Sequence, residues 1–162
     1  MAISSRTNVR PLRAVDRSTP YRSAVVLGAR FGGALAVLAV GAVHLQQYDY
    51  LYSSIPTIGT LFLLNFLGAT GIGMGLLAPV ERLLGRRGGA AVGLLALGGI
   101  ALAASAFVFL LVAEHTPLFG FMEPDYDPPA ILASRIAEVV AVVLLSGFLL
   151  ARFAWRGRRT RW

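Results

Sequence analysis

The sequence predicts an all-α, polytopic membrane protein whose single domain is a four-transmembrane-helix bundle. Of its 162 residues, 56% are hydrophobic and only 14% are charged, which lies outside the usual composition of soluble domains. The apolar residues form long runs instead of alternating with polar ones, and such runs favour membrane helices over strands. Within a transmembrane domain at 23–155, we predict spans at residues 25–43, 55–80, 89–112 and 130–151.

The first span, residues 25–43, follows a basic arm at residues 1–22. Its apolar run exceeds the roughly 7 to 15 residues typical of a signal peptide, the rival interpretation, so we predict a helix that is retained. Arg30 lies about five residues inside the span, roughly 8 Å below the boundary at about 1.5 Å per residue. We expect its side chain to extend back to the lipid headgroups, with a buried functional charge as the alternative.

The second span, residues 55–80, begins with Pro56, a residue suited to the first turn of a helix. We expect residues 44–54, rich in glutamine and tyrosine, to form an outer loop before it. The inner half of the second span carries several glycines, and the third span, residues 89–112, is rich in alanine. Small residues let membrane helices approach closely. We therefore predict that the third span packs against Gly68, Gly71, Gly73 and Gly75.

The fourth span, residues 130–151, follows an acidic and proline-rich outer loop at residues 113–129. It carries Arg135 and Glu138, whose i, i+3 spacing lets two side chains touch on a helix. Counted inward along the helices, Asn65 and Glu138 both lie roughly 14 Å deep, near the middle of an apolar core about 30 Å thick. The sequence therefore predicts a buried polar layer or ligand site made of His44, Asn65, Ser105, Arg135 and Glu138.

This polar layer has two interpretations. In the structural one, Arg135 and Glu138 neutralise each other while Asn65 forms a hydrogen bond between helices. In the functional one, the layer is a polar pocket open to the outer side, because charges inside a membrane tend to face a partner or a wet cavity. Candidates for the outer face of such a pocket are Tyr48, Tyr50, Glu114 and His115.

The basic residues indicate the orientation in the membrane. All 15 are arginines, and they gather in the N-terminal arm, in the turn at 81–88 and in a basic tail at 156–162. The loops at 44–54 and 113–129 contain none. The positive-inside rule therefore predicts a multi-pass protein of the plasma (inner) membrane with both termini in the cytoplasm. We expect this positive charge to contact the lipid bilayer. Aromatic residues do not alternate with the arginines in the way typical of nucleic-acid-binding segments, so we expect no nucleic-acid partner.

Enzymatic chemistry has little support in the sequence. The absence of cysteine excludes disulfides and thiolate catalysis, and no nucleophile elbow, nucleotide-binding loop or zinc-protease motif is present. Imidazole and carboxylate groups expected on the outer side lack the close spacing of metal ligands. We therefore predict no catalytic residue, no cofactor and no metal site, although candidate ligands exist at His44, Glu114, His115, Glu123, Asp125 and Asp127.

Three segments carry a resemblance to a known group of proteins. They are the His-Leu-x-x-Tyr pattern at 44–48, the run Ile55-Pro56-Thr57-Ile58-Gly59-Thr60-Leu61-Phe62-Leu63-Leu64-Asn65, and Pro117-Leu118-Phe119-Gly120-Phe121-Met122-Glu123-Pro124. Over residues 24 to 152 the chain resembles small four-helix membrane proteins of actinobacteria, and in size and span number it is similar to DoxX-like proteins. The resemblance implies the fold and a bacterial source, and it implies no activity.

Three functions follow from these observations as predictions. The first is a non-catalytic accessory or scaffold protein that forms a homo-oligomer or joins a larger membrane complex through its small-residue faces. The second is a binder of a lipid, quinone or other amphipathic small molecule in an outward-facing polar pocket. The third is a small proton-coupled transporter in which Glu138 carries the proton.

Overall fold

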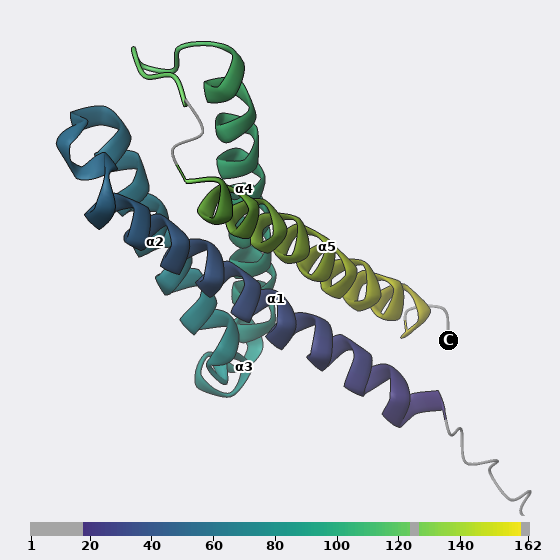
Figure 1. The fold of residues 1–162 in the computed structure, drawn as a ribbon. Helices are drawn as coiled ribbons and strands as arrows, with labels where there is room; N and C mark the ends of the chain where they lie inside the picture. The colour runs from purple at the N-terminus through teal and green to yellow at the C-terminus, as the bar shows by residue number, and fades with distance from the viewer. Residues whose placement is uncertain (1–17, 124–126, 160–162) are drawn as a thin grey trace, which may run out of the picture.

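The computed structural model describes residues 18–123 and 127–159, with side chains described between residues 23 and 154. Figure 1 shows an all-helical chain. Within the described residues, four helices are long and apolar enough to cross a membrane, which confirms that part of the prediction. The elements are α1 Ser18–Tyr50, η1 Tyr52–Ser54, α2 Pro56–Leu77, α3 Val80–Leu83, η2 Gly85–Arg87, α4 Gly88–His115 and α5 Pro128–Arg159.

The helices extend further than the predicted spans. The outer loop expected from residue 44 is wrong over its first part, because α1 continues through Tyr50. No glycine or proline lies between His44 and Tyr50 to end the helix, and the first proline comes at Pro56, where α2 begins. The predicted basic arm lies largely outside the described residues, as do Asp125 and the last residues of the tail.

The four long helices form a ring in which each has two main neighbours. α1 packs most extensively on α5 and α2, and α4 packs on α5 and α2. Figure 1 shows α1 and α2 as a hairpin, with α5 lying along α1. The chain enters and leaves at the end that also carries α3, which we call the termini end. The opposite end, with η1 and residues 116–123, is the loop end.

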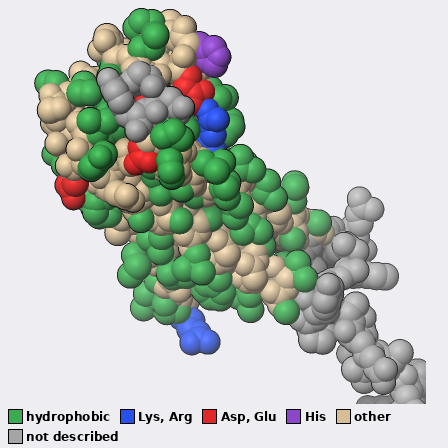
Figure 2. Space-filling view, viewed as in Figure 1, with side chains coloured by type: hydrophobic (Ala, Val, Ile, Leu, Met, Phe, Trp, Pro, Cys, Tyr) green, Lys and Arg blue, Asp and Glu red, His purple; other side chains and the backbone are tan. Residues whose placement is uncertain are grey.

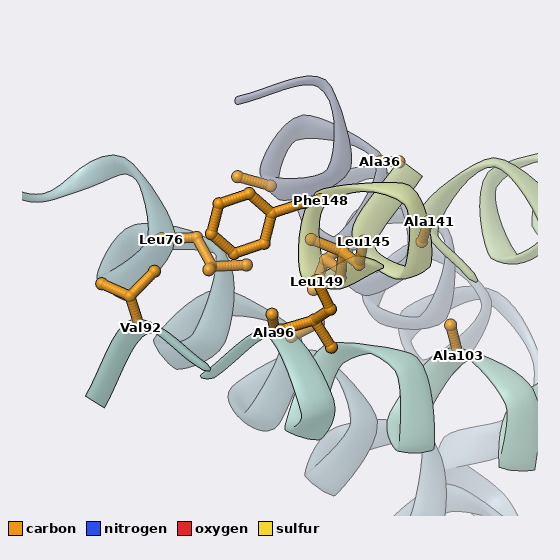
Figure 3. Close-up of a cluster of buried hydrophobic side chains, with 12 residues drawn as sticks. Ala36, Leu76, Val92, Ala96, Ala103, Ala141, Leu145, Phe148 and Leu149 are labelled. Carbon is orange, nitrogen blue, oxygen red and sulfur yellow. The ribbon is translucent and has the colours of Figure 1, made fainter. Parts of the chain in front are cut away.

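The hydrophobic core lies in the termini half of the bundle. Its buried residues come from the middle of α1, the second half of α2, the first half and middle of α4, and the middle and second half of α5. Figure 3 shows Phe148 and Leu145 of α5 close to Leu76 of α2 and Ala96 of α4. Leu76 and Leu145 are fully buried, so this half contains a closed hydrophobic core.

Glycines permit the close packing in this half. A Cβ added to Gly73 would lie 2.5 Å from Leu38 of α1, and one added to Gly99 would lie 2.7 Å from Leu145 of α5. The predicted packing between the second and third spans is right only in part. Gly68 and Gly75 face α4, whereas Gly73 faces α1 and Gly71 faces no atom within 4 Å.

The surface of the helices is apolar. Leu35, Leu94 and Leu150, on three different helices, are each more than half exposed. On the face shown in Figure 2, hydrophobic side chains cover the middle of the molecule, while acidic side chains gather at the loop end. A patch of this extent is unusual on a soluble monomer and suits contact with lipid chains.

A buried arginine closes the termini end. Arg30 of α1 is only 7% exposed, so the expectation that its side chain extends to the headgroups is wrong. Its Nε donates to the Leu76 carbonyl at 2.7 Å and its Nη2 to the Ala78 carbonyl at 2.8 Å. These carbonyls belong to the end of α2, where backbone acceptors lack helical partners. Arg30 therefore caps a neighbouring helix instead of reaching lipid.

Glu81 connects this arginine to the last helix. The Arg30 Nη1 donates to both carboxylate oxygens of Glu81, at 3.0 and 2.9 Å. Arg152 of α5 approaches the same carboxylate at 3.8 Å and donates to the Gly89 carbonyl at 2.7 Å. Residues from α1, α3 and α5 thus form one charged cluster, Arg30, Glu81 and Arg152, in which each of the three side chains has a partner.

Candidate ligand-binding site

The loop half of the bundle contains a cavity of about 390 Å³, which is in the size range of small-molecule sites. All four long helices line it, together with η1 and the loop before α5. Its walls are mostly apolar, with Leu61 and Phe62 from α2 and Leu102 and Leu110 from α4 among them. The cavity thus lies where the same helices no longer meet in a packed core.

A buried carboxyl group lies in the wall formed by α5. Glu138 is 1% exposed and accepts a hydrogen bond from the Ser134 hydroxyl to its Oε1 at 2.9 Å. Its second oxygen, Oε2, is buried and has no hydrogen-bond partner among the described residues. The same is true of Oδ1 of Asn65, which lines the cavity from α2. A buried acceptor left without a partner is costly, and it often indicates a functional site.

The predicted pair between Arg135 and Glu138 is wrong. Arg135 does not line the cavity, and its guanidinium forms a salt bridge with Glu114 of α4. Ser134 and Glu138 are four residues apart and share the face of α5 that points into the bundle. Arg135 is rotated from Ser134 by about 100° around the helix, so its side chain leaves the bundle interior toward α4.

His44 reaches the cavity from α1. Its Nδ1 lies 2.9 Å from the Val40 carbonyl, and its ring lies 5.0 Å from that of Phe62. A carbonyl only accepts, so Nδ1 is the donor, and Nε2 is an acceptor when the ring is neutral. Together with Asn65, Ser105 and Glu138, His44 lines one cavity, so the structure brings together four of the five residues of the predicted layer.

The loop end covers the cavity with residues other than those expected. Tyr52 of η1 donates a hydrogen bond to the Glu123 carboxylate. Its ring stacks on Phe62 at 4.5 Å and meets the edge of Phe121 at 5.5 Å. Gly59 allows this packing, because a Cβ there would lie 2.5 Å from the Tyr52 carbonyl oxygen. The segment 116–123 is therefore fixed across the cavity by a buried polar contact within an aromatic cluster.

A second contact ties the start of α5 to α1. The Gln47 amide donates to Asp127 at 2.8 Å, and the other oxygen of Asp127 accepts the Ala130 amide at 3.2 Å. Asp127 thus caps the first turn of α5 while it binds α1. Both contacts hold the described part of the loop between α4 and α5 against the helical hairpin.

The outer-face candidates do not form this cover. Tyr48, Tyr50 and His115 are absent from the cavity lining, and Tyr50 is 75% exposed. His115 is exposed and contacts the Leu111 carbonyl of its own helix. Glu114 is occupied by Arg135. α1 continues as a helix through Tyr50, and both tyrosines lie on that helix outside the cavity lining.

The cavity opens sideways between two helices. Among its lining residues, the exposed ones are Leu64 of α2, 58% exposed, and Ser105 and Phe109 of α4, Phe109 being 46% exposed. Figure 1 shows α2 and α4 diverging toward the loop end. The opening therefore faces the same apolar surface that lipid chains would cover, instead of facing the outer solution as the sequence suggested.

Three residues of the site were given no such role by sequence reasoning. Ser134 was recognisable in principle, because it precedes Glu138 by one helical turn. Tyr52 and Glu123 are 71 residues apart, and no periodicity relates them. Only the three-dimensional fold brings this pair together.

Comparison with known proteins gives no information about this site, so its chemistry is inferred from its geometry. Neither a protein-family model, nor a curated protein, nor a solved structure matches the chain. Over the described residues, no group of three or more histidine, aspartate or glutamate side chains is placed to hold a metal ion. The described residues that line the cavity offer apolar contact and hydrogen bonding to a ligand.

Proposed function

We propose that this protein binds an amphipathic small molecule of the membrane, a lipid or a quinone-type compound, in the cavity of the loop half. The observation that carries this proposal is a buried carboxyl group with an unpartnered oxygen in the wall of an otherwise apolar cavity. Such a combination of apolar walls with few polar groups is typical of ligand sites. An apolar tail fits the walls, and a polar head supplies the missing hydrogen bond.

The position of the opening supports a ligand taken directly from the bilayer. Leu64 and Phe109 border the opening with apolar surface, so a lipid-soluble molecule can enter without crossing water. The segment around Tyr52 and Glu123 closes the loop end, which limits access from that side. A ligand that is soluble only in water has no comparable route.

The sidedness of the cavity follows from the arginines. In the orientation that we propose, both termini lie in the cytoplasm of the inner membrane, because the loops at the loop end contain no arginine. The cavity then lies in the outer half of the bilayer. A scaffold role and a proton-coupled transporter role stay predictions, and the cavity favours binding over both.

A retained ligand in mild detergent tests the proposal. We would record native mass spectra of the wild type, of Asn65→Leu and of Thr60→Val after adding a total bacterial lipid extract. Asn65→Leu replaces a polar cavity residue with an apolar one of similar size. Thr60→Val makes a matched change on an exposed part of α2 that does not line the cavity.

We expect the wild type and Thr60→Val to retain a bound molecule, and Asn65→Leu to lose at least tenfold in occupancy. A tenfold loss corresponds to about 1.4 kcal/mol, in the range of one buried hydrogen bond. A wild type that retains nothing, or an Asn65→Leu variant that retains as much as the wild type, contradicts the proposal.

A further inference from the structure

We infer that the head group bound in this cavity donates hydrogen bonds and carries no negative charge, as a hydroxyl or a primary amine does. The inference rests on the proposed function and specifies its ligand class. It comes from an inventory of the donors and acceptors that the described lining residues present. In that inventory the buried lining atoms without a hydrogen-bond partner are oxygens, Oδ1 of Asn65 and Oε2 of Glu138.

The hydroxyl protons of the lining are already used. Ser134 donates to Glu138 at 2.9 Å and Ser105 donates to the Leu102 carbonyl at 2.9 Å. Tyr52 donates to Glu123. A hydroxyl group has one proton to give, so these three side chains have only lone pairs to offer a ligand.

With Glu138 as a carboxylate, the buried polar atoms of the lining that still need partners are acceptors. Oε2 of Glu138 and Oδ1 of Asn65 are buried without a hydrogen-bond partner in the described structure. Nε2 of a neutral His44 is also an acceptor, because Nδ1 is directed at the Val40 carbonyl. A head group with protons to donate can satisfy these atoms. A head group that only accepts, such as the carbonyl of an oxidised quinone, cannot.

The charges of the lining exclude anions. The described residues that line the cavity include Glu123 and Glu138 and no arginine or lysine. Arg135 does not line the cavity, and its guanidinium is bound to Glu114. A phosphate or carboxylate in this cavity would be desolvated beside acidic groups with no cation to contact it.

Four amphiphiles with the same twelve-carbon tail distinguish the effect of hydrogen-bond donation on binding affinity from the effect of head-group charge. Dodecanol is a neutral donor and dodecylammonium a cationic donor. Dodecyltrimethylammonium is a cation without an N–H group, and dodecanoate is an anion. Binding to the wild type in nanodiscs of a neutral lipid is measured by native mass spectrometry and by thermal shift.

We expect dodecanol and dodecylammonium to bind at least tenfold more tightly than the other two, a difference of about 1.4 kcal/mol, since the other two leave the buried acceptors unmatched. If dodecyltrimethylammonium bound as tightly as dodecylammonium, positive charge and not hydrogen-bond donation would determine the affinity. If dodecanoate bound as tightly as dodecanol, the cavity would accept an anionic head group that donates no hydrogen bond. Either result overturns the inference while the binding function stands. Failure of all four to bind contradicts the binding function itself.

Glu138→Gln provides a second test, because it keeps the size of the side chain and adds an N–H donor. We expect it to lose the preference for donors and to bind dodecanoate at least tenfold more tightly than the wild type does. Asp49→Asn, the same chemical change at an exposed position outside the lining, should leave all four affinities unchanged. An unchanged preference in Glu138→Gln contradicts the role assigned to this carboxyl group. The wild-type series keeps the inference testable if the variant fails to fold.

Discussion

The two halves of the bundle use the same four helices in different ways. In the termini half, side chains from α1, α2, α4 and α5 meet in a continuous core. In the loop half, the same helices surround a cavity of about 390 Å³. Arg30 is deeply buried in the termini half, and Glu123 and Glu138 are deeply buried in the loop half. Arg30 has partners for its donors, whereas Glu138 keeps an oxygen without a partner among the described residues.

This difference separates a structural charge from a candidate functional one. Arg30 joins the end of α2 to Glu81, so it contributes to the fold by satisfying groups that would otherwise lack partners. Glu138 receives one hydrogen bond from its own helix and makes none to another described helix. Burial alone does not distinguish Arg30 from Glu138. The two residues differ in the number of hydrogen-bond partners that other helices contribute to them.

The shape of each half follows from side-chain size. Glycines at the contacts of the termini half allow the helices to approach closely. In the loop half, Phe62, Phe109 and Phe121 line the space between the helices. Rings of this size keep backbones apart, and the space that remains between them is the cavity.

Arg30→Leu tests the termini half and should have the largest effect. It leaves the buried Leu76 carbonyl and part of the Glu81 carboxylate without the donors of Arg30, while the Ala78 carbonyl keeps only the Val80 amide. We therefore expect a loss of about 3 kcal/mol in the free energy of unfolding. Reversible unfolding in mixed micelles measures it. Arg82→Leu makes the same change at an exposed arginine and should lie within about 0.5 kcal/mol of the wild type. Equal effects of the two variants would show that Arg30 is not a structural residue.

Tyr52→Phe tests the closure of the loop half. It removes one hydrogen bond to a buried carboxylate and keeps the ring contacts, so we expect a loss of about 2 kcal/mol. Hydrogen exchange should become faster over residues 116–123. The matched variant is Tyr50→Phe, because that hydroxyl belongs to an exposed side chain, and it should change neither quantity. Unchanged exchange in Tyr52→Phe would mean that other contacts hold the segment.

Glu138→Leu tests the same half and should act in the opposite direction. It removes a buried oxygen that has no partner, so we expect the ligand-free protein to gain about 1 kcal/mol in the free energy of unfolding. Glu114→Leu is the contrasting variant. It leaves the half-buried Arg135 without its salt bridge and should destabilise the protein. A loss of stability in Glu138→Leu as large as that in Arg30→Leu would assign Glu138 a structural role.

Sequence reasoning predicted the helices better than the contacts between them. Hydropathy located the four long helices because the apolar runs exceed what a bilayer requires. Depth counting placed Asn65, Ser105 and Glu138 at one level, and all three line the cavity. It could not give the direction of each side chain around its helix. For that reason it joined Arg135 to Glu138, and it missed both the cap that Arg30 forms on α2 and the contact between Tyr52 and Glu123.

The contact between Arg30 and Glu81 also determines an order of events during synthesis. The two residues are 51 positions apart, and at about 5 to 20 residues per second Glu81 is added roughly 3 to 10 s after Arg30. Arg30 is therefore made before any of its partners exists. At that stage its guanidinium can find acceptors only in groups other than Leu76, Ala78 and Glu81, such as water. Completion of α2 and α3 ends that stage, and Arg152 joins the cluster last.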